Sequence, residues 1–182
     1  MERRCGECTL CCTLLPVRTL EKKGGERCKN QRGLGCKVYH KEGFPIECKL
    51  WNCRWLIDPT TTKLLRPDIS HYVIDIMPDF VTSPQANGRD IKVPVLQVWI
   101  DPRYPDAHRD PNLREWVRQH EPQCAVLCRY GEMEAILLIP PHMSSKGEWE
   151  ERGGDGPGMT MENRTHRADE IAAVLTNTGA MK

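Results

Sequence analysis

The chain concentrates its cysteines at the amino end, and no other feature constrains its fold as strongly. Eight of its ten cysteines fall within the first 53 of 182 residues, and the opening stretch CGECTLCC places four thiols in eight positions. Few apolar residues accompany them, and the Gly- and Lys-rich run KKGGERCKNQRGLGC interrupts those few. A segment so poor in core-forming residues needs a metal or a disulfide cross-link to fold. The eight cysteines are Cys5, Cys8, Cys11, Cys12, Cys28, Cys36, Cys48 and Cys53.

The redox state expected for these thiols favours a metal over disulfides. The start, MERRCGEC, has positive charge but no apolar stretch behind it, so we expect no secretory signal. No apolar run reaches the length of a membrane-spanning helix. We therefore expect a cytoplasmic protein, in a compartment where disulfides do not persist. Clustered Cys-x-x-Cys spacings in such a chain indicate metal binding, and we expect all eight cysteines to be ligands.

The spacing of the first four cysteines leaves the identity of the metal open. Cys5, Cys8 and Cys11 recur at intervals of three, so that three thiolates lie on one curved loop, as in proteins that hold a [4Fe–4S] cluster. Cys12 follows directly, and because neighbouring side chains tend to diverge, we expect one of the pair to face either a different centre or a different wall of the same one. Eight thiolates also divide into two closed zinc sites. The triple spacing slightly favours iron–sulfur. A closed thiolate set favours a structural or electron-transfer role over hydrolysis.

The opening motif resembles that of a known family. CGECTLCC has the CxxCxxCC pattern of the YkgJ-like cysteine-cluster proteins, a family described as zinc- or iron-chelating, and GCKVYHKEGFPIECKLWNC is similar to its later segment. That family often has Arg-Pro before a cysteine, whereas here Pro45 follows Phe44. The resemblance covers about the first third of the chain and implies metal ligands, but no reaction. The ligands that it implies are the opening Cys5, Cys8, Cys11 and Cys12 and the later Cys28, Cys36, Cys48 and Cys53.

Two further groups of side chains are weaker candidates for ligands. Cys124 and Cys128 lie four apart in the apolar stretch CAVLCRYG, and we expect them to pack in a core on one face of a strand. His40 lies between Cys36 and Cys48, where it is an alternative ligand that could replace one thiolate. With eight thiols present, we expect the cysteines to take precedence.

An enzymatic role is the less expected one. The stretch DPRYPDAHRD gathers Asp101, Asp106, His108 and Asp110, but turn and cap formation explains these residues more simply than acid–base chemistry. Some flagellin-modifying lysine methylases carry a similar cysteine cluster, yet nothing in this chain resembles a cofactor loop for that chemistry. We therefore expect no catalytic residues and no organic cofactor.

Hydrophobic patterning predicts an α+β fold in three segments. Residues 1–56 form the metal-stapled cysteine module, 57–143 a small β-rich domain, and 144–182 a flexible linker with a short C-terminal helix. Strands are expected in HYVIDIMPDFV, VPVLQVWID, CAVLCRYG and EAILLIPP, and a helix in NLREWVRQHE, capped by Asp110 or Asn112. The order β-β-α-β-β favours a small antiparallel sheet with the helix on one face.

Inside the cysteine module, the patterns predict short elements only. A helical turn is expected after Pro16, and GCKVYHKEG is expected to form a strand or a hairpin edge. The apolar residues of IECKLWNCRWL recur at helix-like spacing, which places Cys48 and Cys53 on or beside a helix.

Charge is segregated along the chain and bears on the partners. Residues 1–56 hold 12 Lys and Arg against 6 Asp and Glu, whereas the rest hold 14 against 19. A basic front beside possible zinc knuckles invites nucleic acid, but two zinc ions with eight thiolates would reduce its surplus from +6 to about +2. Nucleic acid is thus an unlikely partner, and a membrane is not expected.

The expected function is metal binding, by an iron–sulfur cluster or zinc, with a structural or redox role. The alternative is an assembly or interaction protein, in which the metal only staples a docking surface and a partner binds the β domain or the C-terminal tail. A nucleic-acid-binding zinc protein and a modification enzyme are weaker possibilities. The sequence leaves open the number of centres and which cysteines share one.

Overall fold

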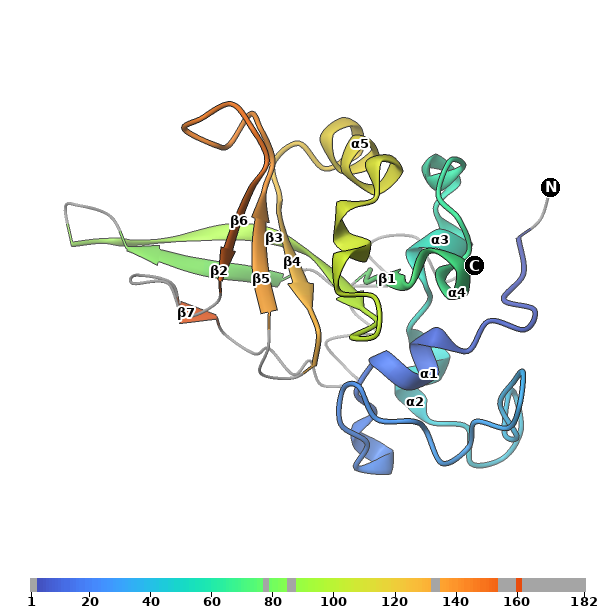
Figure 1. Cartoon of the computed structure of the whole chain (residues 1–182). Coiled ribbons are helices and arrows are strands. Elements are labelled where there is room, and N and C mark those ends of the chain that lie inside the picture. Colours follow the sequence, from blue (N-terminus) through green and yellow to red (C-terminus); the bar gives the residue numbers. More distant parts are fainter. Residues whose placement is uncertain (1–2, 77–78, 85–87, 132–134, 154–159, 162–182) are drawn as a thin grey trace.

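The protein is described by a computed structural model, which covers residues 3–76, 79–84, 88–131, 135–153 and 160–161 (Figure 1). Its fold is of the α+β class, with a mixed seven-stranded sheet and short helices. Six strands follow the order β6-β5-β4-β3-β2-β7, and β1 pairs with β3. The strands are β1 Tyr72–Ile74, β2 Asp79–Pro84, β3 Asp90–Ile100, β4 Ala125–Arg129, β5 Ala135–Ile139, β6 Glu150–Gly153 and β7 Thr160–Met161.

Strand β3 is the longest strand and organises the sheet. β2 pairs antiparallel with its first half, up to Asp79 opposite Val95, and β1 pairs antiparallel with its last residues, from Tyr72 opposite Ile100. Strand β4 pairs with β3 in parallel, with Val95 opposite Ala125. The strands expected in VPVLQVWID, CAVLCRYG and EAILLIPP are confirmed as β3, β4 and β5, whereas the stretch HYVIDIMPDFV contains two strands, β1 and the start of β2, where one was expected.

The prediction that this sheet is purely antiparallel is wrong for β3 and β4. These strands are parallel, and the connection between them contains the 3-10 helix η3, Pro105–Arg109, and the helix α5, Pro111–His120. A parallel pair requires a crossover of a dozen residues or more, and the helix supplies it. The helix was predicted correctly from the sequence, but local patterns do not show whether the strand that follows it pairs parallel or antiparallel to β3.

Helix α5 covers one face of the sheet. Asp110 caps it by accepting a hydrogen bond from the Asn112 N–H, and Pro111 occupies its first turn, as expected for a helix start. Its buried residues Leu113, Trp116 and Val117 share one core with inward-facing residues of β1, β3, β4 and β5. Cys128 is fully buried in this core, which confirms the packing role expected for it, and Cys124 packs against its edge.

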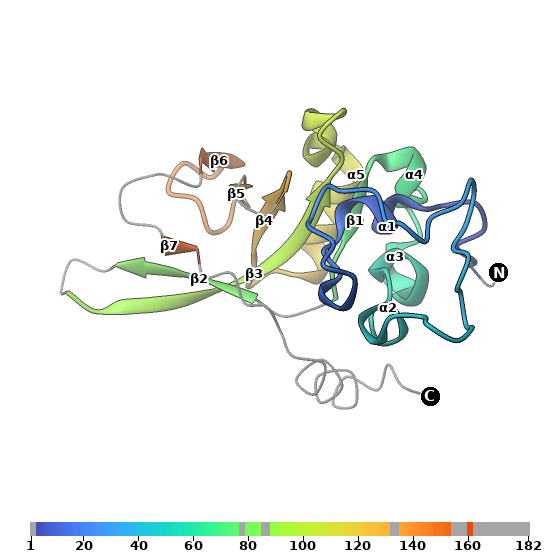
Figure 2. The same cartoon turned by 90° about the horizontal axis from the view of Figure 1, so that it is seen from below.

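The cysteine module packs against the opposite face at the β1 end of the sheet. A module–sheet cluster joins Leu10, Leu14 and Cys53 to Val73 of β1 and Trp99 of β3. These strand residues alternate with those that face α5, so the two layers lie on opposite sides of the same strands. Figures 1 and 2 show the short helices gathered at this end of the molecule. They are α1 Leu10–Leu14, η1 Arg18–Leu20, α2 Ile46–Leu50, α3 Arg54–Ile57, η2 Pro59–Thr61 and α4 Pro67–Ser70.

The elements expected inside the module are partly confirmed. The helical turn after Pro16 is η1, but GCKVYHKEG forms turns, and only an isolated bridge joins Gln31 to Cys36. The prediction of a strand there is wrong because Gly43 and His40 adopt positive φ angles, which break an extended backbone.

The segment after residue 143 contains sheet structure where a linker was predicted. Strand β6 pairs with β5 through Glu150 opposite Ile139, and β7 pairs with β2. The polar side chains of β6 hid this edge strand, because backbone hydrogen bonds form it without an apolar pattern. The C-terminal helix expected near residues 166–179 lies outside the described residues. Among the described helices, none has the length and apolar character needed to cross a membrane.

Candidate metal centre

All eight clustered cysteines are free thiols, and they are carried by the short elements around α1. Cys11 and Cys12 lie in α1 itself, while Cys48 lies in α2 and Cys53 directly precedes α3, as the helix-like spacing predicted. The other four occupy turns on either side of α1: Cys5, Cys8, Cys28 and Cys36. Residues that are up to 48 positions apart in the chain are thus carried to one end of the fold.

Four of these thiols, which we call the first set, gather beside the module–sheet cluster: Cys5, Cys8, Cys11 and Cys53. The Cys8 N–H donates to the Cys5 carbonyl at 3.0 Å, and Cys8 and Cys11 pack against the cluster that contains buried Cys53. The pKa of Cys53 is raised to about 12, first by burial and then by the neighbouring Cys8 and Cys5 thiols. The pKa of Cys5 is raised by burial and by Cys12, so this set also adjoins the remaining thiols.

The other four thiols, the second set, surround α2 and the turns next to it: Cys12, Cys28, Cys36 and Cys48. The Cys28 N–H donates to the Cys12 carbonyl at 3.0 Å, and the Gln31 N–H donates to the Cys28 carbonyl at 3.0 Å. Gln31 in turn forms the bridge with Cys36. The pKa of Cys48 is raised to about 12, first by burial and then by neighbouring groups that include Cys12, Cys28 and Cys36.

The two sets meet at the adjacent residues Cys11 and Cys12. Their thiols form a hydrogen bond, which raises the pKa of Cys11 and lowers that of Cys12. The pKa of Cys11 is also raised by burial and by the charges of Cys12, Cys8 and Cys53. The pKa of Cys12 is also lowered by the Lys22 ammonium, against the opposing effect of burial.

Lys22 is a buried cation beside the second set. Its side chain is only 7% exposed, and its ammonium donates to the carbonyls of Thr13 at 3.0 Å, Lys23 at 3.1 Å and Leu15. Burial lowers the pKa of Lys22, and the charges of Cys28 and Cys12 oppose this effect. Sequence reasoning missed this residue, because a lysine in KKGGERCK has the signature of a solvated loop.

The first set has a different charged neighbour. Arg66 and Asp68 form a two-bond ion pair at 2.6 and 2.7 Å, and the Cys8 thiol donates a hydrogen bond to Asp68. Arg66 also lies over Gly6, where an added Cβ would meet its Nη1 at 3.2 Å and where φ is +54°. Glycine at this position thus allows the turn between Cys5 and Cys8 and the approach of the guanidinium.

The donor chemistry fits a thiolate-bound metal, whereas the side-chain positions leave the ligands apart. In the part of the chain that the structure describes, no three His, Cys, Asp or Glu side chains converge in a way that holds a metal ion as they stand. The donors are nevertheless eight free thiols, the ligand type that zinc and [4Fe–4S] clusters take in fours. His40 is exposed, and its ring packs against Tyr39 and Phe44.

The acidic stretch DPRYPDAHRD serves turns and caps, as its composition predicted. Asp101 is buried and accepts hydrogen bonds from the backbone N–H and the guanidinium of Arg103, while Asp110 caps α5 and accepts from the Tyr72 hydroxyl at 2.8 Å. His108 lies between the Pro105 carbonyl and Glu151. A surface hollow of about 630 Å³ adjoins this stretch, but its walls bring together no chemistry-bearing set comparable to the cysteines.

No family model, curated protein or solved structure matches this chain. The fold and the site define its class by themselves: a mixed α+β protein whose amino-terminal module carries eight free thiols against one end of the sheet.

Proposed function

We propose that this protein binds a metal through its amino-terminal cysteines, as an iron–sulfur cluster or zinc, in a structural or redox role. The observation that carries the proposal is the gathering of eight free thiols on the short elements around α1, at one end of the fold. Soft thiolate ligands in closed sets suit both kinds of centre, and they leave no open position for a hydrolytic water. The resemblance of CGECTLCC to the YkgJ-like cysteine-cluster proteins supports the same function.

The packing of the module supports a cross-linking role for the metal. Between residues 21 and 43 the only buried side chains are those of Lys22 and Cys28, so this stretch has almost no apolar anchor of its own. Ordering each of its residues costs about 1–2 kcal/mol of conformational free energy. Metal bonds through Cys28 and Cys36 would supply the missing anchor, as structural zinc does in small domains.

The bound group would decide the chemistry of the module. An iron–sulfur cluster supplies one-electron transfer, whereas zinc supplies a rigid cross-link without redox activity. The fold of this chain positions the cysteine ligands and excludes water on the Trp99 side through the module–sheet cluster. It also places Lys22 near the second set. None of these roles requires a substrate site.

Anaerobic purification of the full chain with metal and sulfide analysis tests the proposal. A brown protein with acid-labile sulfide identifies an iron–sulfur centre, and a colourless protein with zinc identifies the structural alternative. Cys8→Ser should lower the metal content and disorder the module, whereas the matched control Cys128→Ser should leave the metal content unchanged, because Cys128 lies in the α5 core. Native protein that is folded and free of both metals would refute the proposal.

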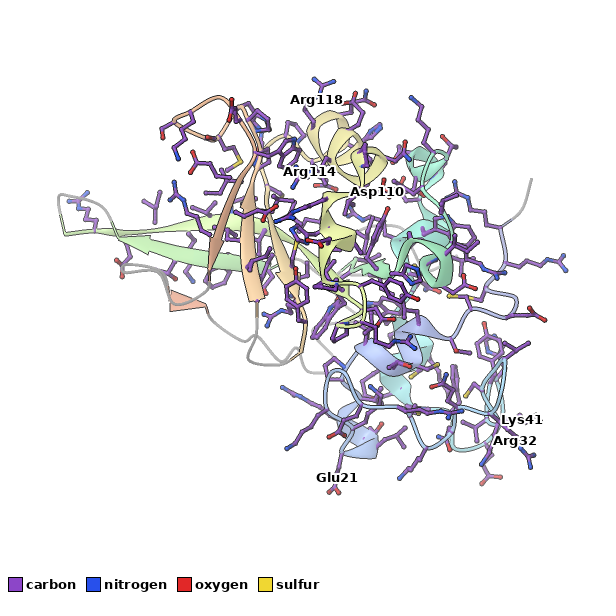
Figure 3. All side chains as sticks on the ribbon, in the orientation of Figure 1. Glu21, Arg32, Lys41, Asp110, Arg114 and Arg118 are labelled. Carbon is purple, nitrogen blue, oxygen red and sulfur yellow. The ribbon has the colours of Figure 1, made fainter. Side chains whose placement is uncertain are left out.

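A second candidate is an interaction protein in which the metal cross-links a docking surface. The exposed loop of the module, residues 27–41, favours it. Leu34 and Tyr39 are 64% and 55% exposed, and Arg32 and Lys41 project from the same end of the molecule (Figure 3). The five exposed basic side chains of this loop pair with no carboxylate among the described residues. They are Arg27, Lys29, Arg32, Lys37 and Lys41.

A photo-cross-linking amino acid at Leu34 tests this candidate. An acidic protein partner should give one adduct that disappears when Lys37 and Lys41 are both changed to Glu, since the charge attraction is then reversed. The same amino acid at exposed Ile69, on α4, is the matched control. A mobility shift of duplex DNA that weakens with salt would indicate nucleic acid instead. An adduct that persists in the charge-reversed variant counts against this surface.

A further inference from the structure

We infer that a hollow beside helix α5 binds a small phosphate monoester that carries a planar ring. This inference is independent of the metal-binding proposal, because the hollow adjoins α5 and the cysteine module packs against the other face of the sheet. The hollow has a volume of about 340 Å³, at the lower end of the range for small-molecule sites. Its walls are formed by Arg109, Pro111, Arg114, Glu115, Arg118 and Trp149.

Three arginines line this hollow. Arg114 and Arg118 lie one turn apart on α5, and Arg109 is the last residue of η3, just before the helix. Figure 3 shows Arg114 and Arg118 on α5, at the opposite end of the molecule from Arg32. Like charges four residues apart on one helix face destabilise the helix. The placement of these two arginines therefore favours a ligand, rather than the stability of α5, as its reason.

The carboxylate nearest to Arg114 does not use all of the arginine's donors. Glu151 of β6 accepts two hydrogen bonds from Arg109, at 3.0 and 2.9 Å, and one from Nη2 of Arg114 at 3.0 Å, so both of its oxygens are occupied. Within the described ranges of the chain, Nε and Nη1 of Arg114 have no acceptor, and Nε is buried. A buried donor without a partner is rare and costly. The Arg114 side chain is still 23% exposed, so an oxyanion in the hollow can supply an acceptor to this guanidinium.

The other two carboxylates at the hollow belong to exposed ion pairs. Glu115 accepts from Nε and Nη2 of Arg118 at 2.9 and 2.7 Å, and Asp106 pairs with Nη1 of Arg109 at 2.9 Å. All four side chains are exposed, and exposed pairs of this kind are weak, so an incoming oxyanion can take the place of either carboxylate. Three carboxylates balance the three guanidiniums in charge, but each guanidinium offers five N–H donors. The hollow thus has a surplus of donors that an oxyanion would satisfy.

The apolar part of the wall indicates what the oxyanion is attached to. Trp149 is half-buried, packs against the edge of the α5 core, and borders the hollow together with Pro111. The Arg114 guanidinium lies over the indole, with Cζ at 5.4 Å from the ring centroid, and this cation–π contact holds the guanidinium in place. Guanidinium groups match phosphoryl oxygens in geometry, and an indole is a surface on which a planar ring stacks. A bare phosphate would leave this apolar wall uncovered, so we assign the hollow to a ring-bearing monoester.

Isothermal titration calorimetry of the full, metal-loaded chain with phenyl phosphate and with inorganic phosphate tests the inference. Phenyl phosphate should bind about tenfold more tightly than inorganic phosphate, because only its ring covers the Trp149 wall. Arg118→Gln should weaken the binding of phenyl phosphate about tenfold, since it removes a charged donor. Glu115→Gln should instead tighten it about threefold, because it frees the Arg118 donors. The matched control Arg32→Gln, an exposed arginine in the cysteine module, should leave the affinity unchanged.

The two variants in the hollow change opposite members of one exposed pair, so neither should disturb folding, and their opposite effects cannot come from a general loss of structure. The absence of saturable binding of phenyl phosphate would overturn the inference, as would weakening by Arg32→Gln that equals the weakening by Arg118→Gln. Equal affinities for phenyl phosphate and inorganic phosphate would overturn the assignment of the ring. Tighter binding of a phosphoserine peptide than of phenyl phosphate would overturn the small-molecule assignment in favour of a protein partner. The metal content should be native in every variant, so failure of this site leaves the metal-binding proposal untouched.

Discussion

The hydrogen bonds of Asp75 link the cysteine module to the sheet, and their removal should separate the two. The Asp75 carboxylate accepts from the indole N–H of Trp51 at 2.7 Å and from that of Trp99 at 3.2 Å. Trp51 lies in the module, between α2 and α3, whereas Trp99 lies in β3. Asp75→Ala removes both acceptors and leaves the buried Trp99 indole without one, so it should destabilise the junction directly.

The geometry sets the size of this effect. Hydrogen bonds to a charged group contribute about 1.5–3 kcal/mol each, and the lower value applies to both because Trp51 is partly exposed and the Trp99 bond is long. Asp75→Ala should thus lower the free energy of unfolding by about 3 kcal/mol. With a urea dependence of about 2 kcal/mol per molar, the midpoint should fall by about 1.5 M. Asp75→Asn, which keeps one acceptor oxygen, should lose about half as much.

Urea unfolding of the metal-loaded chain, followed by tryptophan fluorescence and by far-ultraviolet circular dichroism, measures this loss. A double-mutant cycle with Trp51→Phe isolates the bond across the junction and should give a coupling energy of about 1–2 kcal/mol. A midpoint of Asp75→Ala within about 0.3 M of the native value would refute the reasoning, as would zero coupling with Trp51→Phe. Either result would mean that apolar packing in the module–sheet cluster holds the junction by itself.

Three further predictions concern the sheet and α5. Leu113→Ala removes a fully buried side chain from the α5 core and should cost about 2–5 kcal/mol in thermal or urea unfolding, whereas a cost below about 1 kcal/mol would contradict the packing. Asp110→Ala removes the α5 cap and the acceptor of the Tyr72 hydroxyl and should cost about 1–2 kcal/mol, with Asp110→Asn closer to native. The hydrogen bond from Arg109, together with His108, lowers the pKa of Glu151 to about 2. Its contribution to stability is therefore present above the ordinary pKa of glutamate and should fall as the pH drops through about 4 toward 2; Glu151→Gln should flatten the pH dependence of the melting temperature in that window, and an unchanged slope would argue against it.

Local patterns in the sequence predicted the elements whose signals are local. Helix α5 has its cap, its proline in the first turn and one apolar face, and all three signals act within ten residues. Strands β3 and β4 are apolar runs that any pairing would bury, and Cys128 was expected in the core for the same reason. The parallel pairing of β3 with β4 and the polar edge strand β6 carry no such signal. Strand partners depend on contacts between distant segments, and an edge strand forms through its backbone alone.

The same distinction between local sequence signals and tertiary packing applies to the cysteine site. The eight candidate ligands could be predicted from their clustering in a segment with few apolar residues, because a segment without an apolar core needs a cross-link to fold. The gathering of those ligands at one end of the fold, and the burial of Lys22 among carbonyls of the α1 region, depend on how α1 and the segment 46–53 pack against the sheet. The spacing of cysteines along the chain shows which side chains are available as metal ligands. Only the tertiary packing decides which of them lie close together and which charged groups face them.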